Sequence, residues 1–125
     1  MAAILVMTTV GTEEQANLIA QELVARRHAA CVNIVSSLKS VYRWQGKICK
    51  DSEYLLLVKT EEGEYDEIAA VIRELHTYEV PEILAIPTSR VDARFGGWIS
   101  SSLDKEAEFP DEDEEEDLEL DDSSY

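Results

Sequence analysis

The chain has 125 residues, of which 45% are hydrophobic, and its formal net charge at pH 7 is −16. This length and apolar content are typical of one domain with its own core, and no apolar run is long enough to predict a membrane-spanning helix. The acidic composition offers no basic stripe that would neutralise a phosphate backbone, so we expect neither a membrane nor a nucleic-acid partner.

The first predicted element is a strand over Ala2–Val10. This run is rich in β-forming residues and lacks the basic flank and longer apolar core of a signal peptide. Thr12 and Gln15 form a T-x-x-Q capping box, which opens a helix that we extend to about His28. Four apolar residues at helical spacing define its buried stripe: Ala16, Ile19, Ala20 and Leu23.

Two long strand-like runs follow, at about Ala30–Trp44 and Lys47–Thr60, with only Gln45 and Gly46 between them. An average strand has ~5–6 residues, and at ~3.3 Å per residue each of these arms would extend roughly 45 Å. A body of about 100 residues has a radius of gyration of only ~13 Å, so the hairpin is predicted to project beyond its own domain. Five apolar residues of the first arm share one parity and are predicted to lie on one face: Val32, Ile34, Leu38, Tyr42 and Trp44.

A projecting apolar hairpin is an aggregation hazard unless another chain pairs with it. No other element of the chain is left to cover this hairpin. We therefore predict a homo-oligomer in which a second copy is the partner.

The remaining pattern completes an α+β domain. A helix is predicted at about Glu61–His76, a short strand at Glu82–Ile86 after Pro81, and a last helix capped by Asp92. The resulting order predicts a ferredoxin-like βαββαβ sandwich with a long central β-hairpin and a C-terminal helix.

The negative charge is concentrated at the C-terminal end. Residues 104–125 hold 13 acidic residues and one lysine, whereas residues 1–103 hold 14 acidic and 10 basic residues. We assign residues 1–105 to the folded domain and predict that residues 106–125 form a disordered acidic tail, because Asp111–Asp117 is a run of seven acids. Its role is either solubility or weak binding of cations.

Four segments occur in the order Ala29–Ile34 (AACVNI), Tyr42–Ile48 (YRWQGKI), Leu57–Thr60 (LVKT) and His76–Ile83 (HTYEVPEI). They resemble the CutA divalent-cation tolerance proteins, and the similarity covers about residues 3–103. The resemblance implies a trimer of ferredoxin-like subunits whose long hairpins pair edge to edge with neighbouring subunits, similar in architecture to PII signalling proteins. It also implies a role in tolerance of divalent metals, copper in particular.

The resemblance also suggests where a metal would bind. In some members of the family, the proposed copper ligands are a cysteine at the end of the first strand and a His-His pair at the end of the second helix. Thr8 stands at the cysteine position and Leu75 at the first histidine position, so only His76 matches. His76 is therefore the one candidate metal ligand that the resemblance supplies, and the thiols of Cys31 and Cys49 are the other two candidates.

Each candidate ligand has a structural alternative. His76 has an imidazole that suits Cu²⁺ or Zn²⁺, but at a helix C-terminus it can instead pair with the last carbonyls. Cys31 is either a thiolate ligand or a small buried hydrophobe at the start of a strand. Cys49 is expected to be more exposed and open to adventitious metal or oxidation. Two cysteines form no disulfide framework, which indicates reduced thiols and a cytoplasmic location.

Charged and aromatic residues of the hairpin offer further candidates. Glu53 and Lys59 are expected to line a cleft or to form cross-strand ion pairs. Four bases near the tip either form an anion pocket between subunits or keep exposed strand edges from pairing: Lys39, Arg43, Lys47 and Lys50. Three aromatic residues alternate with polar ones, which favours sheet packing and subunit contact over ligand stacking: Tyr42, Trp44 and Tyr54.

No Gly-rich phosphate loop or nucleophile motif is present in the sequence, so we expect no enzyme. We predict a homotrimeric, divalent-metal binding protein that contributes to metal-ion tolerance, with copper as the foremost cofactor and other copies of the chain as partners. The alternative is a PII-like regulatory module that binds a small anionic ligand in the inter-subunit cleft through the hairpin bases. A third interpretation is a small-molecule enzyme that uses His76 as acid or base.

Overall fold

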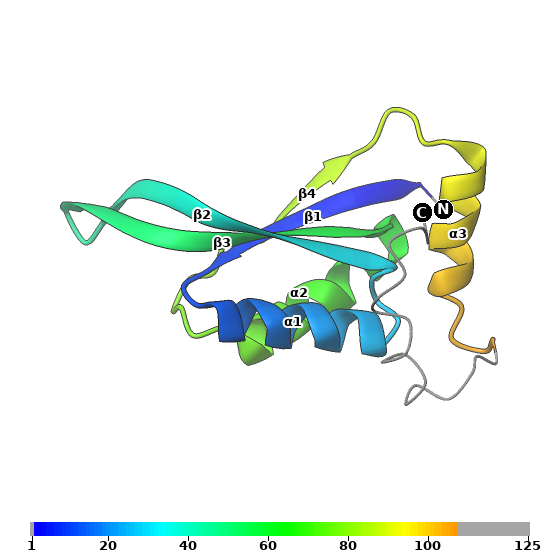
Figure 1. The fold of residues 1–125 in the computed structure, drawn as a ribbon, viewed down its shortest axis with the longest axis horizontal. Coiled ribbons are helices and arrows are strands. Elements are labelled where there is room, and N and C mark those ends of the chain that lie inside the picture. Colours follow the sequence, from blue (N-terminus) through cyan, green and yellow to red (C-terminus); the bar gives the residue numbers. More distant parts are fainter. Residues whose placement is uncertain (1, 108–125) are drawn as a thin grey trace.

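The computed structural model describes residues 2–107. Its elements are β1 (Ala3–Val10), α1 (Glu13–Ala25), β2 (Cys31–Trp44), β3 (Lys47–Glu61), the 3₁₀ turn η1 (Glu62–Glu64), α2 (Tyr65–Leu75), β4 (Leu84–Pro87) and α3 (Ala93–Ser102). The strands form one antiparallel sheet in the order β2-β3-β1-β4. This confirms the predicted ferredoxin-like order, the long hairpin and the C-terminal helix (Figure 1). Within residues 2–107, no helix has the length and apolar character needed to cross a bilayer.

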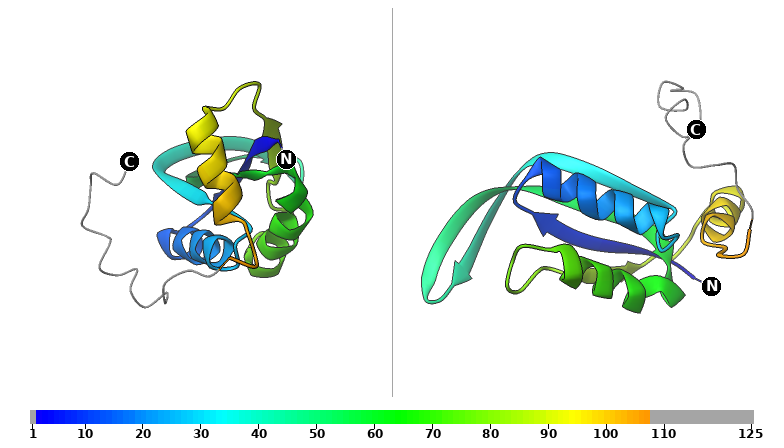
Figure 2. Two further views of the ribbon diagram at one scale, coloured as in Figure 1. Left: turned by 90° about the vertical axis from the view of Figure 1, so that its right-hand side faces the viewer. Right: turned by 90° about the horizontal axis from the view of Figure 1, so that it is seen from below.

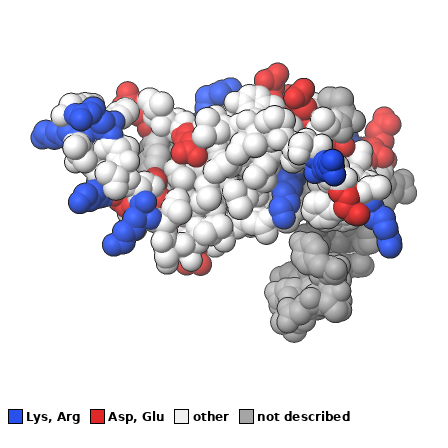
Figure 3. Space-filling model, turned by 90° about the horizontal axis from the view of Figure 1, so that it is seen from above, with Lys and Arg blue, Asp and Glu red and all other residues white. Residues whose placement is uncertain are grey.

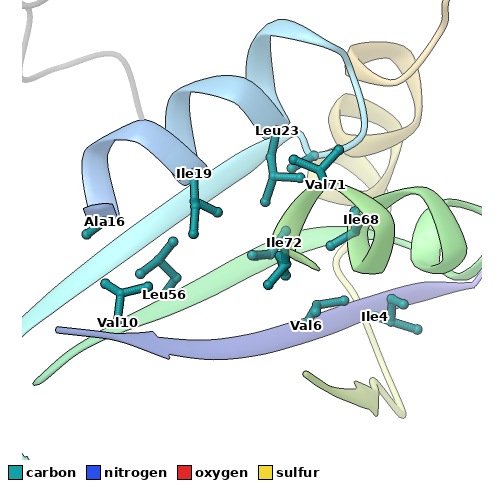
Figure 4. Packing of buried hydrophobic residues seen from close by; sticks show 12 residues of the cluster. Ile4, Val6, Val10, Ala16, Ile19, Leu23, Leu56, Ile68, Val71 and Ile72 are labelled. Carbon is teal, nitrogen blue, oxygen red and sulfur yellow. The ribbon is translucent and has the colours of Figure 1, made fainter. Parts of the chain in front are cut away.

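Both α1 and α2 lie against one face of the sheet, while α3 lies at the end of the molecule away from the hairpin tip (Figures 1 and 2). Alternate residues of β1 point into this layer, because successive side chains of a strand face opposite sides. The core fills the space between sheet and helices (Figure 4). Its fully buried large side chains are Val6, Val10, Ile19, Leu23, Leu56, Val58, Ile68 and Ile72.

The ends of α1 differ from the predicted ones in two details. The Thr12 side chain accepts a hydrogen bond from the Gln15 backbone N at 3.1 Å, as a capping box requires, but the Gln15 side chain donates to the Leu75 carbonyl at 2.9 Å instead of returning to Thr12. The helix stops at Ala25 rather than near His28, because Arg27 adopts a φ of 61°. The His28 N then bonds to the Leu23 O at 3.0 Å, which closes a Schellman-type end.

The hairpin has the predicted length, with 14 residues in β2 and 15 in β3. Gln45 and Gly46 have φ values of 50° and 80°, and a two-residue turn of this kind matches the twist of the strands. The arms extend past the ends of both helices (Figure 1). Near the tip, Val41 and Ile48 are accordingly 64% and 66% exposed.

The prediction that five apolar residues of β2 share one face is wrong. A bulge lies between Val35, which pairs with Leu55, and Leu38, which pairs with Glu53, so β2 contains one residue more than β3 over this interval. Ser37 takes up the bulge with a φ of 63°. One inserted residue reverses the side-chain alternation. Val32 and Ile34 therefore face the helices, whereas three residues beyond the bulge lie on the opposite face: Leu38, Tyr42 and Trp44.

In the second half of the chain, α2 and β4 both begin later than predicted. The expected helix from Glu61 starts as η1, and the α-helix proper runs from Tyr65 to Leu75, with Asp66 and Glu67 in its first turn. The last strand covers Leu84–Pro87 rather than Glu82–Ile86, because these residues pair with Met7 back to Ile4 of β1. The predicted Asp92 cap is confirmed: its carboxylate accepts from the Phe95 N at 3.0 Å.

The predicted tail, residues 106–125, lies outside the described residues from position 108 onward. The residues just before it contact the body. Arg27 Nη1 donates to the carbonyls of Asp104 and Ala107, each at 2.9 Å, and Lys105 Nζ lies 3.0 Å from Glu64 Oε2. Contacts of this segment with the body therefore reach at least to Ala107.

Candidate functional site

His76 lies at the C-terminal end of α2, where its ring bridges two segments of backbone. The ring Nδ1 accepts a hydrogen bond from the Tyr78 backbone N at 3.0 Å, so the proton sits on Nε2, which donates to the Thr9 carbonyl at 2.7 Å. Both nitrogens are thus engaged. His76 could bind a metal only by giving up one of these bonds.

Thr8 and Leu75, the other two positions that the resemblance suggested for a metal site, face the core. Thr8 is fully buried on the helix-covered face of β1, and its hydroxyl has no hydrogen-bond partner among residues 2–107. Leu75 is partly buried and packs against the hydrophobic core. Neither position presents a donor atom to the surface.

The two cysteines lie far apart on the hairpin. Cys31 pairs with Lys59 at the base of β2, whereas Cys49 pairs with Tyr42 near the tip. Cys49 and Lys59 are ten positions apart along β3, which at ~3.3 Å per residue is roughly 33 Å. Neither cysteine forms a disulfide within residues 2–107, and both are half-buried. One chain therefore does not bring His76, Cys31 and Cys49 together.

A cluster of phenols and carboxylates instead lies on the sheet face away from the helices, at the base of the projecting hairpin. The Tyr78 hydroxyl donates to Glu53 Oε2 at 2.6 Å, and Glu53 is only 6% exposed. Tyr42 of β2 donates a short hydrogen bond to Asp51, which lies on β3 as Glu53 does. A Cβ at Gly11 would lie 3.2 Å from the Tyr78 hydroxyl oxygen, so the absence of a side chain there lets the phenol approach. We call Tyr42, Asp51, Glu53 and Tyr78 the tyrosine–carboxylate cluster.

The surroundings of this cluster raise the pKa values of its two phenols and of the neighbouring Glu82. Burial raises the pKa of the Tyr78 phenol far above its ordinary value, and the hydrogen bond to Glu53 raises it further. The hydrogen bond to Asp51 raises the pKa of Tyr42 to about 12. Burial, followed by the charge of Glu53, also raises the pKa of the nearby Glu82 carboxyl. No basic side chain among residues 2–107 forms an ion pair with these three carboxylates.

The expected ion pairs of Glu53 and Lys59 are not present in the described part of the chain. Glu53 binds the Tyr78 phenol, and Lys59 Nζ lies 5.7 Å from the centre of the Phe95 ring. Tyr54 packs against the core, as its alternation predicts. Several basic side chains gather at the end of the molecule that the hairpin occupies, and others lie on the body (Figure 3).

Sequence reasoning missed the partner of Glu53. Tyr78 and Glu82 fall within the HTYEVPEI segment, but this segment has no periodicity that predicts where its side chains point. The alternation of β3 does place Glu53 and Asp51 opposite the buried Leu56 and Val58, and this signal predicts their shared face.

Comparison with known proteins identifies close relatives. The model of the CutA1 divalent ion tolerance protein family matches residues 4–102. The Divalent-cation tolerance protein CutA of Thermus thermophilus is 46% identical over 94 residues, which cover 75% of this chain and 91% of that protein. The chloroplastic Protein CutA 1 of Oryza sativa is 36% identical over 100 residues, or 80% of this chain and 56% of that protein. The chain spans about half the length of the plant and mammalian relatives that it matches.

Solved structures agree with the sequence matches. CutA1 from Oryza sativa has a TM-score of 0.81 and 34% identity, over 84% of this chain and 96% of that chain. The periplasmic divalent cation tolerance protein CutA from Archaeoglobus fulgidus has a TM-score of 0.79 and 34% identity, over 81% and 98% of the two chains. These structures share the ferredoxin-like fold of this chain.

Proposed function

The chain belongs to the CutA1 divalent ion tolerance protein family, and we propose that it contributes to tolerance of divalent metal ions, copper in particular, as a homotrimer. The observation that carries this proposal is the family match over residues 4–102, which includes the sheet, all three helices and the hairpin. The proposal assigns the chain no catalytic step.

The residues of a single chain do not fit a copper site. Within residues 2–107, no three side chains of His, Cys, Asp or Glu converge to hold a metal. We therefore place the proposed metal where His76 meets donors of a neighbouring subunit. Its imidazole would supply a nitrogen ligand of the kind that Cu²⁺ prefers, after the hydrogen bond from the Tyr78 N to Nδ1 is lost.

Exposed apolar residues support the homotrimer. The sheet face without helices carries Tyr42 and Trp44 from the hairpin and Leu84 and Ile86 from β4, and these side chains are between 40% and 54% exposed. Large apolar residues gathered on one surface are typical of protein interfaces. Other copies of the chain are the partner that the hairpin length favours.

A cytoplasmic location is also part of the proposal. Cys31 and Cys49 lie at opposite ends of the hairpin and form no disulfide within residues 2–107, which agrees with a reducing compartment.

The metal proposal can be tested by isothermal titration calorimetry of the full chain with CuCl₂ and ZnCl₂. We expect Cu²⁺ to bind more tightly than Zn²⁺, by the general order of divalent affinities, and binding to weaken in acid because only a neutral imidazole ligates a metal. His76→Ala should remove the copper isotherm. His28→Ala is the matched control, since His28 instead lies 2.9 Å from Glu64. Equal copper uptake by the wild type and His76→Ala would discard His76.

The second candidate function is binding of a small anion by the hairpin bases. Lys39, Arg43 and Lys50 lie on one face of the hairpin and form no ion pair with any residue of the described chain. A nucleotide or dicarboxylate that raises the melting temperature without metal, and fails to do so in Arg43→Gln, would favour this function over metal binding.

A further inference from the structure

One face of the projecting hairpin is basic. Leu56 of β3 is buried beneath the helices, and uninterrupted alternation along β3 puts Ile48 and Lys50 on the same side. Residues that pair across the hairpin share a side, so this face comprises two apolar residues and three bases: Lys39, Val41, Arg43, Ile48 and Lys50. We call this set the basic hairpin face. It extends beyond both helices, and nothing else in residues 2–107 covers it (Figure 1).

The charge of the basic hairpin face is not compensated. None of its three bases forms an ion pair within residues 2–107. Asp51, next to Lys50 in sequence, lies on the opposite face, where it accepts a hydrogen bond from Tyr42. Val41 and Ile48 lie beside the bases and are 64% and 66% exposed. A complementary occupant therefore needs acidic side chains that flank apolar ones.

The chain itself contains a segment of this composition. Residues 108–125, which lie outside the described part of the chain, hold 11 acidic residues and no base. Within them, the run DLELD at positions 117–121 alternates acids with two leucines. Charge complementarity therefore favours this segment as the occupant.

The contacts of residues 104–107 fix where the acidic segment begins. Arg27 Nη1 donates to the Ala107 carbonyl at 2.9 Å, and Arg27 lies four positions before β2 begins at Cys31. Arg43 is 12 positions along β2 from Cys31, which is roughly 40 Å at ~3.3 Å per residue. Glu119 is likewise 12 positions beyond Ala107, and an extended chain spans ~3.3–3.6 Å per residue. The acids near Glu119 can therefore reach the basic hairpin face of the same chain.

We propose that residues 115–122 dock along the basic hairpin face of their own chain, with acids paired with its three bases and the two leucines packed on Val41 and Ile48. The docked segment neutralises the bases that the second candidate function would use to hold a small anion, so it acts as a built-in competitor at that surface. The inference requires neither metal binding nor self-association, and its test is independent of both.

The test measures how fast individual lysines of the full chain react with acetic anhydride, by mass spectrometry of the digested protein. Lys39 and Lys50 should be acetylated about threefold more slowly in the wild type than in the variant Glu119→Gln, Asp121→Asn, Asp122→Asn, because exposed ion pairs are individually weak. In 1 M NaCl the difference should disappear, since the Debye length falls to ~3 Å.

Two controls separate docking from a general effect of negative charge. The variant Asp111→Asn, Glu112→Gln, Asp113→Asn removes the same number of charges at positions only four to six residues beyond Ala107, or ~13–20 Å of chain. These acids cannot reach Lys39, so this variant should keep the slow acetylation. Lys47, which pairs with Trp44 on the opposite face of the hairpin, should react at the same rate in all three chains. Circular dichroism checks that each variant is folded.

Equal acetylation of Lys39 and Lys50 in the wild type and in the Glu119 variant would overturn the inference, whether the lysines are open or covered by another copy. Equal acceleration in both triple variants would assign the protection to net charge alone and would overturn it too. A last arm mixes the isotopically labelled Glu119 variant with excess unlabelled wild type. Its lysines should stay reactive, and protection of the labelled chain would show that the segment comes from another copy, against docking within one chain.

Discussion

The phenol of Tyr78 donates a hydrogen bond of 2.6 Å to the carboxylate of Glu53, which is 6% exposed. This contact joins the irregular segment after α2 to the middle of β3, 25 residues away in sequence. A buried carboxylate is costly unless a donor satisfies it. The phenol therefore stabilises both the segment and the strand at the base of the hairpin.

Tyr78→Phe should destabilise the fold. It leaves the ring in place but removes the donor to Glu53, and a buried acceptor left without its partner costs about 1–3 kcal/mol. Urea unfolding at neutral pH would measure this loss.

Tyr42→Phe is the control for this prediction. Its hydroxyl also bonds to a carboxylate, Asp51, but both residues are exposed. We expect a change in unfolding free energy of only about 0–1 kcal/mol. Equal losses in the two variants would contradict the special role of the buried Glu53.

Alkaline pH should weaken the native state through Tyr42. Its hydrogen bond to Asp51 raises the pKa of the phenol to about 12, whereas a tyrosine of the unfolded chain titrates near ~10. Between these values the unfolded state binds fewer protons than the native state, so stability falls as pH rises. Asp51→Asn should lower the pKa of Tyr42 toward ~10 in a spectrophotometric titration and flatten the loss of stability. An unchanged phenolate titration in Asp51→Asn would assign the shift to another cause.

The sequence predicts those elements whose residues act locally. The Thr12 cap, the Gln45-Gly46 turn and the Asp92 cap each depend on neighbours within three residues, and each is confirmed. Strand and helix periodicity identifies the core for the same reason, since one face of each element is buried. The ferredoxin-like order follows from these elements together.

Features that depend on distant residues were not predictable. The bulge at Ser37 has no strong sequence signal, because serine is common in strands and turns alike, and it exchanges the faces of the outer half of β2. The hydrogen bond between Tyr78 and Glu53 depends on the path of the segment after α2, which has no periodicity in its sequence. The hydrogen bond of His76 Nε2 depends on the Thr9 carbonyl, which belongs to β1 and is distant in sequence.

Two buried threonines of the sheet should respond in opposite ways to replacement by valine. Thr8 and Thr60 are both 0% exposed, but Thr60 Oγ1 donates to the His28 carbonyl at 2.6 Å, while the Thr8 hydroxyl has no partner in the described chain. Thr8→Val should stabilise the protein by about 1 kcal/mol, because it removes an unsatisfied polar group. Thr60→Val should destabilise it by about 1–2 kcal/mol. Thermal unfolding of both variants distinguishes them, and a loss in Thr8→Val would mean that its hydroxyl has a partner.

Trp44→Asp should weaken assembly and lower the melting temperature together. Trp44 lies on the hairpin face away from the helices and is 40% exposed in a single chain. A charge placed in the proposed subunit contact would oppose association, and loss of assembly lowers the apparent stability of an oligomer. Light scattering and thermal unfolding at one protein concentration measure both effects. Leu18→Asp, on the exposed side of α1, is the control and should leave the mass unchanged. A Trp44→Asp variant with wild-type mass and stability would place the subunit contact elsewhere.

Two C-terminal deletions should separate solubility from stability. Removal of residues 108–125 takes away 11 acidic residues and no base, so the protein should become less soluble while its melting temperature stays the same. Removal of residues 104–125 also takes away the carbonyls that Arg27 binds and the Lys105 pair with Glu64. This larger deletion should cost about 1 kcal/mol of unfolding free energy, because the lost contacts are partly exposed. Equal melting temperatures for the two truncated chains would show that these contacts contribute nothing to stability. Loss of copper or calcium binding on removal of residues 108–125 would assign the acidic residues a role in metal binding as well as in solubility.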